Sequence, residues 1–334
     1  MKAIVCTAFG DESNLVYENF PAPRLGPHQV RIAVKAAGVN FVDTVIIGGA
    51  YQGKLELPFV PGVEVAGVVT EIADGVATCR PGDRVLAIVA VGGYAEEVVT
   101  DAVSVIVIPD SMEWVDAAGF AGSWTAAYHG LTARGRLKPG ETLLVHGAGS
   151  GTGLAAVAVG HQAGAKVIAV AGNADKLALA KEQGADLLID HSREDVRTRA
   201  KELTGGRGVD VVFDPVGGKM VDASLRCVAP GGRILVIGFA SGTVPQIPAN
   251  IVLVKNCDIV GYTWGGHWAH DPLPLRDALY TLLDWYDRGK IRSHVTSCMP
   301  LSDTAKAISL LKQRAVLGKQ VVIVDPSVPV RPAP

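Results

Sequence analysis

The sequence has few cysteines, and none of them forms a recognisable pattern. There are five among 334 residues, an odd number, and no two stand at the spacing of a metal-binding pair. Disulfide bonds and a cysteine-based zinc cluster are therefore not expected. The five are Cys6, Cys79, Cys227, Cys257 and Cys298.

An excess of positive charge and a long apolar run are also missing. The formal net charge is −2, which argues against binding to nucleic acid or to a membrane surface. No stretch of about 18 apolar residues occurs, so no membrane span is predicted. The first ten residues, MKAIVCTAFG, are too short and interrupted for a signal peptide and read as a strand. We expect a cytoplasmic protein.

The sequence is instead rich in apolar residues and glycine. Apolar residues make up 49% of the chain and charged residues 19%, and there are 39 glycines. This composition indicates well-filled cores and many tight turns. Up to about residue 110, short apolar runs are cut by Gly and Pro, which predicts a compact, barrel-like β domain.

From about residue 113 the pattern changes to alternating strands and helices. A long helix is predicted over Glu113 to Arg134, and the following alternation predicts a doubly wound parallel sheet, giving an α/β fold class. The chain is then divided into a first part of the catalytic domain (1–124), a dinucleotide-binding domain (125–264) and a return to the catalytic domain (265–334). We expect the active site where the two domains meet.

The stretch ETLLVHGAGSGTG, residues 141–153, carries the clearest functional signal. An apolar run ends in a glycine-rich turn and is followed by a helix of small residues and a second apolar run. This is the order of a dinucleotide-binding unit, although the spacing is not a strict GxGxxG. The free N–H groups at the start of the helix would hold a pyrophosphate over Ser150, Gly151, Thr152 and Gly153.

The end of the second strand indicates which dinucleotide is bound. An acidic residue there binds the ribose 2′-hydroxyl of NAD, but this strand ends in Val-Ala-Gly-Asn, with Asn173 last. Asn173 can donate a hydrogen bond to a 2′-phosphate, and Lys176 lies one helical turn further on. Asp175 falls in the first helical turn, where it suits the helix dipole. The sequence favours NADPH; the alternative is that Lys176 is an ordinary solvated lysine.

Aromatic residues near the end of the predicted sheet are candidates for the substrate pocket. Gly238 and Phe239 follow a strand at its carboxyl end, where ligands gather in this kind of fold. Trp264 begins an unusual aromatic and polar cluster, residues 262–268. Phe239 and Trp264 either line the pocket or pack between domains, and the cluster either lines the pocket or contacts a second subunit.

Several motifs together resemble the zinc-free quinone oxidoreductase branch of the medium-chain dehydrogenase/reductase superfamily, which includes zeta-crystallin. The resemblance extends over residues 1 to 325. Its markers are AAGVNFVD (36–43), PGVEVAGVV (61–69), GDRV (82–85), GGYAE (92–96), Thr125-Ala126, LLVHGAGSGTGLAA (143–156) and GKQVVIV (318–324).

The resemblance implies a GroES-like, β-rich catalytic domain and a central Rossmann-type domain. It also implies NADPH, reduction of quinones or other α,β-unsaturated carbonyl compounds, and a homodimer or homotetramer joined through the sheet edge Cys257 to Tyr262, of which the homodimer is favoured. Thr125 is implied to contact the cofactor. Asn40 and Tyr51 match residues near the nicotinamide, although Asn40 also suits the N-cap of a short helix and Tyr51 a half-buried loop position.

The family holds the 2′-phosphate with a lysine, a tyrosine and an arginine. Lys176 and Arg314 match the first and the third. His191 stands where the tyrosine is expected; it can still donate to a phosphate, or it is simply a loop residue that follows a strand.

The zinc-dependent relatives have three ligands that are missing here. Their first cysteine corresponds to Asn40, their histidine to Val63, and their second cysteine falls near Phe120 or Ala121. Only Glu64 remains, and it cannot hold zinc alone because a catalytic site needs three protein ligands. No metal is expected.

The resemblance implies hydride transfer from NADPH to an electron-poor carbon of the acceptor. Asn40 or Tyr51 would stabilise the negative charge on the carbonyl oxygen, and Tyr51 or water would supply the proton. The alternatives are reduction of a C=C bond in enones, enals or acryloyl- and enoyl-thioesters, and, from another class, a non-catalytic NADPH-binding protein.

Overall fold

The computed structural model describes residues 1–51, 53 and 55–329. The chain forms two compact units. Unit 1 comprises Met1–Gly122, Leu279–Asp287 and the chain from Ser293 onward, and unit 2 comprises Ser123–Ala278 and Arg288–Arg292. The domain boundaries predicted from the sequence follow residues 124 and 264. The main segment of unit 2 ends at Ala278, 14 residues after the second predicted boundary.

Unit 1 is built on a seven-stranded sheet with the order β14-β15-β3-β4-β5-β7, and β6 pairs with β3. Alternate residues of the first part of β3 are buried, as expected for a strand with one face on a core. A separate antiparallel ribbon joins β1 and β2. The strands are β1 (Lys2–Cys6), β2 (Leu15–Asn19), β3 (Gln29–Val39), β4 (Glu64–Ile72), β5 (Arg84–Ile88), β6 (Glu97–Asp101), β7 (Val105–Val107), β14 (Val295–Pro300) and β15 (Lys319–Ile323).

The long helix predicted over Glu113 to Arg134 is wrong as a single element. The chain forms a short helix, breaks at Gly119 and Phe120, and then continues as a second helix with a π-helical end. The break falls at a glycine, the residue other than proline that most weakens a helix interior, and a β-carbon at Gly119 would lie 2.8 Å from Lys319 Cγ, so a larger residue does not fit there. The helices of unit 1 are α1 (Phe41–Ile47), α2 (Trp114–Ala118) and α11 (Thr304–Lys312).

Unit 2 contains six parallel strands in the order β10-β9-β8-β11-β12-β13. The chain runs outward from β8 in one direction and then returns to start at β11 in the other. The carboxyl ends of β8 and β11 therefore form the switch point at which such sheets bind ligands. The strands are β8 (Thr142–His146), β9 (Lys166–Ala171), β10 (Leu187–Asp190), β11 (Val209–Asp214), β12 (Val228–Val236) and β13 (Asp258–Gly261).

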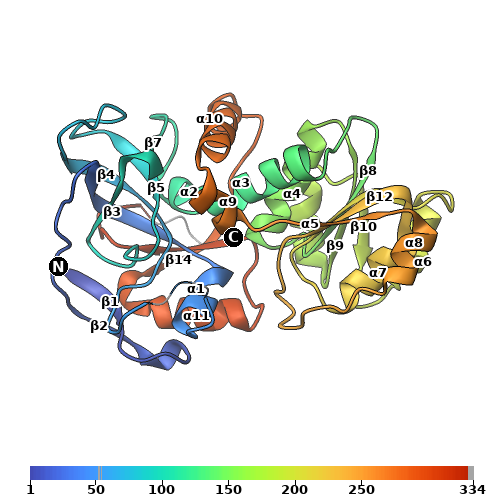
Figure 1. Ribbon diagram of the computed structural model, residues 1–334, viewed down its shortest axis with the longest axis horizontal. Helices are drawn as coiled ribbons and strands as arrows, with labels where there is room; N and C mark the ends of the chain where they lie inside the picture. The colour runs from blue at the N-terminus through green and yellow to red at the C-terminus, as the bar shows by residue number, and fades with distance from the viewer. Residues whose placement is uncertain (52, 54, 330–334) are drawn as a thin grey trace. The chain divides into compact units, whose positions relative to one another are not determined.

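Helices cover both faces of this sheet (Figure 1). Helix α4 packs closely because its residues are small: a β-carbon at Gly160 would lie 2.5 Å from Leu143 Cδ2 of β8. Helices α8 and α9 were not predicted from the sequence. Both are short; α8 follows a proline and α9 contains two glycines. The helices are α3 (Ala121–His129), its π-helical continuation (Gly130–Arg134), α4 (Gly151–Gln162), α5 (Ala174–Glu182), α6 (Val196–Leu203), α7 (Lys219–Cys227), α8 (Ala249–Lys255), α9 (Trp264–His270) and α10 (Leu273–Asp287), which ends in unit 1.

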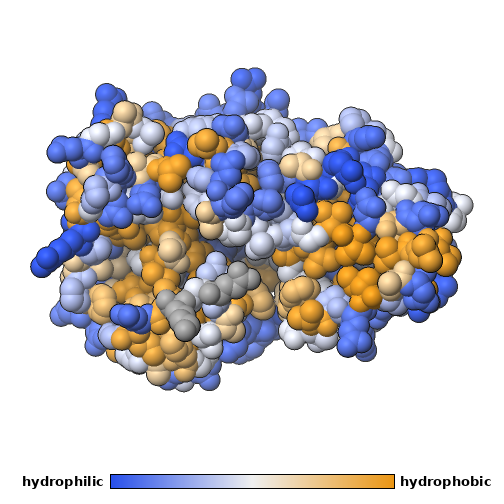
Figure 2. Space-filling view, viewed as in Figure 1, coloured by the Kyte–Doolittle hydropathy of each residue, from blue (hydrophilic) through white to orange (hydrophobic). Residues whose placement is uncertain are grey.

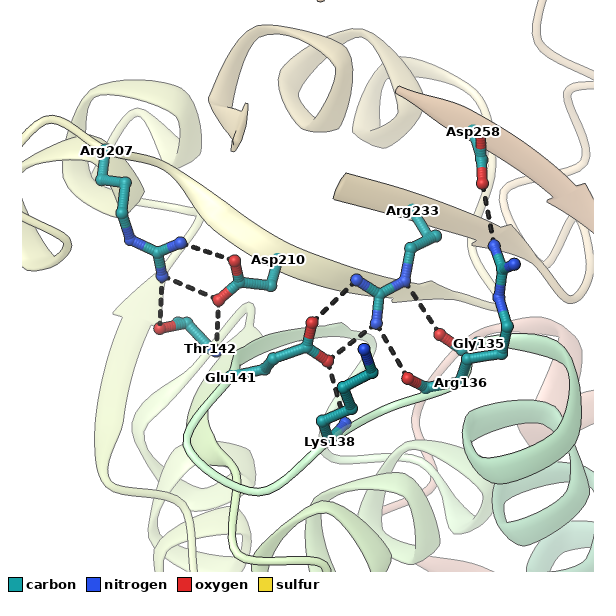
Figure 3. Close-up of polar contacts among 9 residues, drawn as sticks. All are labelled: Gly135, Arg136, Lys138, Glu141, Thr142, Arg207, Asp210, Arg233 and Asp258. Carbon is teal, nitrogen blue, oxygen red and sulfur yellow. Dashed lines mark hydrogen bonds and ion pairs between the residues drawn. The ribbon is translucent and has the colours of Figure 1, made fainter. Parts of the chain in front are cut away.

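Ion pairs join the amino ends of the parallel strands (Figure 3). The guanidinium of Arg233 donates to both carboxylate oxygens of Glu141 at 2.8 and 2.7 Å and to the carbonyl of Gly135 at 2.9 Å. The guanidinium of Arg207 donates to the carboxylate of Asp210, which also accepts the N–H of Thr142 at 2.7 Å. These contacts fix the strands at one end and leave the carboxyl ends for a ligand.

Some apolar side chains of unit 2 remain exposed. Val244, Leu253 and Val254 are exposed, and apolar surface gathers where α8 lies (Figure 2). Among the described residues, no helix combines the length and the apolar character that crossing a membrane requires.

Candidate active site

The glycine-rich turn links β8 to the start of α4 and is shaped by hydrogen bonds. Ser150 is the N-cap of α4: its Oγ accepts the N–H of Gly153 at 3.2 Å and donates to the carbonyl of Gly147 at 2.8 Å. Gly147 has φ +60°, a conformation that glycine adopts without strain. The amino end of a 12-residue helix therefore faces the carboxyl end of the sheet with N–H groups available for an anion.

Two glycines of this turn are required by close approaches. A β-carbon at Gly153 would lie 2.1 Å from the carbonyl oxygen of Gly147, and one at Gly149 would lie 2.4 Å from Lys176 Cβ. Both positions pack against other atoms of the chain, so the turn, called the glycine cradle below, keeps its shape only with glycine there. Its bare backbone can come close to a pyrophosphate.

The predicted 2′-phosphate residues of unit 2 lie together beside the turn. The Lys176 side chain passes over Gly149, and the His191 ring lies against Gly172, 3.0 Å from where a β-carbon would be. Asn173 caps α5, because its Oδ1 accepts the N–H of Lys176 at 2.9 Å. Its oxygen is therefore used in the helix cap, and its amide N–H groups are the donors that a phosphate would meet.

The loops after β11 and β12 close the same end of the sheet. Asp214, almost fully buried, accepts the N–H groups of Val216 and Gly217 at 2.8 and 2.9 Å. Val216 Cγ2 lies 3.1 Å from a β-carbon built at Gly147, so this loop adjoins the glycine turn.

The predicted residues Gly238 and Phe239 stand on the neighbouring loop. A β-carbon at Gly238 would lie 3.4 Å from the carbonyl oxygen of Pro215. Phe239 lies against Gly217 and is 37% exposed, so part of its ring is open to a ligand.

Thr125 and Trp264 have other surroundings in unit 2. Thr125 is fully buried on α3, and nearby Ser123 accepts a long 3.5 Å hydrogen bond from Thr152. Trp264 stacks on Trp268 with ring centroids 5.7 Å apart, and its Nε1 has no hydrogen-bond partner among the described residues. The role of both residues toward a ligand stays a prediction.

A compact polar cluster surrounds Asn40 in unit 1. The ammonium of Lys319 lies 2.6 Å from both Glu64 Oε1 and Asn40 Oδ1. Asn40 Nδ2 donates to Glu64 Oε1 at 3.0 Å, and Gly122 N–H donates to Glu64 Oε2 at 2.9 Å. Sequence reasoning found Asn40 and Glu64 but missed Lys319, whose only signal was its place in the motif GKQVVIV.

A buried carboxyl supports Asn40 from the other side. Asn40 is the N-cap of α1, as the alternative reading of the sequence proposed, and its backbone N–H donates to Asp43 Oδ2 at 2.8 Å. Tyr94 donates its hydroxyl to the same oxygen at 2.6 Å. Burial, opposed by these hydrogen bonds and by Lys319, raises the pKa of Asp43 to about 7.

Tyr51 lies on the loop after α1 and is 43% exposed. It lines a hollow of about 300 Å³ whose other residues are apolar or glycine: Phe9, Ile46, Gly49, Gly53 and Leu55. Positions 52 and 54 of the same loop lie outside the described residues. The hollow offers apolar walls and one phenol, which suits a flat apolar molecule.

Arg314 belongs to unit 1, whereas Lys176 and His191 belong to unit 2. It follows α11 and has φ +57°, and its backbone N–H donates to Leu311 O at 3.0 Å. A shared contact of the three with one phosphate stays a prediction.

No group of three or more His, Cys, Asp or Glu side chains suited to a metal ion occurs among the described residues. The one carboxylate at the expected position, Glu64, is engaged by an ammonium, an amide and a backbone N–H. Independence of zinc stays a prediction.

Comparison with known proteins gives the same two-part organisation. Residues 26–110 match the alcohol dehydrogenase GroES-like domain, and residues 151–286 match a family described as zinc-binding dehydrogenase. The GroES-like, β-rich domain and the parallel-sheet domain predicted from the sequence are confirmed.

Similar proteins cover nearly the whole chain. A quinone oxidoreductase-like protein 2 homologue of Nematostella vectensis is 41% identical over 324 residues, which are 96% of this chain and 88% of that protein. A quinone oxidoreductase of Pseudomonas aeruginosa is 32% identical over 96% of this chain and 99% of its own. Among solved structures, Escherichia coli quinone oxidoreductase complexed with NADPH has a TM-score of 0.91 at 29% identity, covering 97% and 100% of the two chains. The chain belongs to the quinone oxidoreductase branch of the medium-chain dehydrogenase/reductase superfamily.

Proposed function

We propose that this oxidoreductase uses NADPH to reduce quinones or other α,β-unsaturated carbonyl compounds without a metal ion. The observation that carries the proposal is the glycine cradle with Lys176 and His191 at its side. The cradle suits a pyrophosphate, and a strand tip with a cation and without a carboxylate suits a 2′-phosphate. The solved relative from Escherichia coli was complexed with NADPH.

Residues of unit 2 would hold the cofactor. Backbone N–H groups from Ser150 to Gly153 face the pyrophosphate, and Lys176, His191 and the amide of Asn173 face the 2′-phosphate. Arg314 of unit 1 is proposed as a further phosphate contact. When bound, NADPH supplies the hydride, and the protein supplies binding, orientation and electrostatics.

Residues of unit 1 would act on the acceptor. Negative charge develops on the acceptor's carbonyl oxygen, and the side-chain amide of Asn40, which contacts Glu64 and Lys319, would donate a hydrogen bond to it. Tyr51, beside an apolar hollow, donates the proton or passes it from water. Positioning of two flat reactants accounts for the rest of the rate enhancement.

The quaternary structure belongs to the same proposal. Strand β13 is the edge of the parallel sheet, since it pairs only with β12 among the described strands. We propose a homodimer formed through the segment Cys257 to Tyr262. Sedimentation equilibrium would show twice the 34.8 kDa of the chain, and a mass equal to one chain would contradict a dimer.

Steady-state NADPH oxidation with a panel of quinones, 2-alkenals, enones and acyl-thioesters tests the reaction. We expect turnover with quinones or with conjugated carbonyl compounds. Binding of NADPH without turnover of any acceptor would indicate a non-catalytic NADPH-binding protein. Turnover of thioesters alone would move the function to enoyl-thioester reduction.

A further inference from the structure

Lys319 places a buried positive charge directly beside the proposed oxyanion contact. The residue is 6% exposed and Glu64 is 2% exposed, so the ion pair between them is almost entirely removed from water. Burying two charges costs several kcal/mol that their attraction only partly offsets, so such a pair is weak evidence of a stabilising role. A buried pair at this position therefore calls for a functional explanation.

Glycines stand where the backbone passes closest to the side chains of Glu64 and Lys319. A β-carbon at Gly38 would lie 2.2 Å from Glu64 Oε1, and one at Gly119 would lie 2.8 Å from Lys319 Cγ. A β-carbon at Gly122 would lie 3.3 Å from Glu64 Oε2. Glycines from two separate segments thus leave room for the two charged side chains, which come from β4 and β15.

The two charges determine how the amide of Asn40 is oriented. Its oxygen accepts from the Lys319 ammonium and its nitrogen donates to the Glu64 carboxylate. Rotating the amide by 180° would place N–H groups against the ammonium and the oxygen against the carboxylate. Electrostatics at these distances, in a site with little water, opposes that rotation strongly.

The second N–H of the amide is the one that a ligand can take over. The amide nitrogen donates to Glu64 Oε1 at 3.0 Å and, through a longer hydrogen bond of 3.4 Å, to the carbonyl of Gly38. The longer bond is the weaker of the two, so an acceptor oxygen can replace it. The cation at the carbonyl oxygen also draws electron density from the amide, which strengthens the hydrogen bonds that its N–H groups donate.

We propose that Lys319 is a positioning residue for the reduction: its ammonium holds and polarises the Asn40 amide so that the second N–H, which makes only the long bond to Gly38, meets the oxyanion of the acceptor. This inference rests on the proposed function. Lys319 does not itself touch the acceptor; its effect passes through Asn40.

A double-mutant cycle tests the dependence on Asn40. Lys319→Met should lower kcat about 10- to 100-fold, because small misplacements of a catalytic contact have effects of that size, with the Kd for NADPH unchanged. The same change in an Asn40→Ala background should have almost no further effect. Independent losses that multiply, or an unchanged kcat in Lys319→Met, would overturn the proposal.

Two further variants separate positioning from folding. Lys319→Arg retains the cation and should recover part of the lost kcat. Lys35→Met removes another ion pair from the same unit, with Asp325, and should leave kcat unchanged. Thermal melts of all variants identify any that do not fold.

A measurement that does not need activity keeps the two proposals distinct. In protein labelled with [15N]asparagine, the Asn40 side-chain signal is assigned by its loss in Asn40→Ala. Lys319→Met should shift that signal and Lys35→Met should not; an unmoved signal would overturn the role of Lys319. Wild-type protein that reduces no acceptor would contradict the proposed function, and the shift would still decide whether Lys319 holds the amide.

Discussion

At the scale of single residues, we propose that Lys176 sets the preference between the two dinucleotides. Its side chain passes over Gly149 beside the strand tip at Asn173. Lys176→Ala should weaken NADPH binding about tenfold and leave NADH binding unchanged, since a hydrogen bond to a charged group contributes about 1.5–3 kcal/mol. Quenching of tryptophan fluorescence measures both affinities.

A control for this substitution lies on the same helix. Lys181→Ala removes an exposed lysine of α5 whose Nζ makes only a 3.4 Å contact with Asp186 O. It should leave both affinities unchanged. Equal loss of NADPH binding in the two variants would mean that general charge, rather than a contact with the 2′-phosphate, sets the preference.

The buried carboxyl of Asp43 makes stability depend on pH. Burial, the largest influence, raises its pKa from 3.8 to about 7, so the folded state binds the proton more tightly than the unfolded state. The stability due to this group is fully present below the unfolded pKa near 4 and is lost as the pH rises through about 7. Asp43→Asn should remove this dependence.

Thermal melts of wild type and Asp43→Asn between pH 4.5 and pH 8 provide the check. The difference in Tm between wild type and variant should shift in favour of the variant as the pH rises. A difference that is constant over this range would show that Asp43 is ionised in the folded protein throughout.

At the scale of elements, the turn between β8 and α4 depends on the absence of side chains. A β-carbon at Gly153 would lie 2.1 Å from a backbone oxygen, which cannot move as the end of a side chain can. Gly153→Ala should weaken NADPH binding at least tenfold by displacing the N–H groups that face the pyrophosphate. Titration calorimetry measures the loss.

Gly130→Ala is the matched control, because a β-carbon at that position would meet its nearest atoms, Phe213 Cε2 and Tyr262 Cδ1, at an ordinary contact distance of 3.5 Å. It should bind NADPH as wild type does. Unchanged binding in Gly153→Ala would place the pyrophosphate elsewhere.

The ion pairs at the amino ends of the strands stabilise the sheet without taking part in binding. Arg233→Met leaves Glu141 without its strongest partner, which should lower stability by about 2 kcal/mol and Tm by about 4–8 °C. The exposed pair of Arg193 and Asp190 has a separation of 3.8 Å, so Arg193→Met should change Tm little. Thermal melts that give equal shifts would contradict the assigned importance of Arg233.

The parallel sheet was predictable because each of its strands is an apolar run bounded by turns. Strand β9 has the sequence KVIAVA, and β11 has the sequence VDVVFD. The helix expected from Glu113 is interrupted at Gly119, where a side chain from β15 leaves room only for glycine. Contacts of that kind join distant parts of the chain and leave no periodic pattern in the sequence.

In the candidate site, too, the residues that belong to local sequence patterns were predictable, and those that depend on long-range contacts were not. The glycine turn and Lys176 follow local patterns, so sequence reasoning found them. Lys319 was missed because its meaning depends on Asn40 and Glu64, some 250 residues earlier, and a lone lysine at the start of a strand resembles many others. The pKa of Asp43 likewise depends on burial that no local pattern reports.

At the scale of the whole molecule, we propose that the two units contribute different groups to one reaction. Unit 2 carries the cofactor cradle, and unit 1 carries the polar cluster around Asn40 and the hollow beside Tyr51. The cation that the zinc-dependent relatives obtain from a metal is, in this account, replaced by fixed hydrogen-bond donors. Activity should then survive removal of metals.

Exhaustive dialysis against a chelator tests this independence. The dialysed protein should retain its full kcat, and elemental analysis should find much less than one zinc per chain. Loss of activity that returns on adding zinc would show that the site holds a metal despite the engagement of Glu64 by Lys319.

The most direct test of the account is the initial rate of quinone reduction by the metal-free protein with NADPH and, separately, with NADH. We expect turnover with NADPH and a kcat/KM at least tenfold higher than with NADH, in line with the strand tip at Asn173 and Lys176. Equal rates with the two cofactors, or no reduction of any quinone or conjugated carbonyl compound, would contradict it.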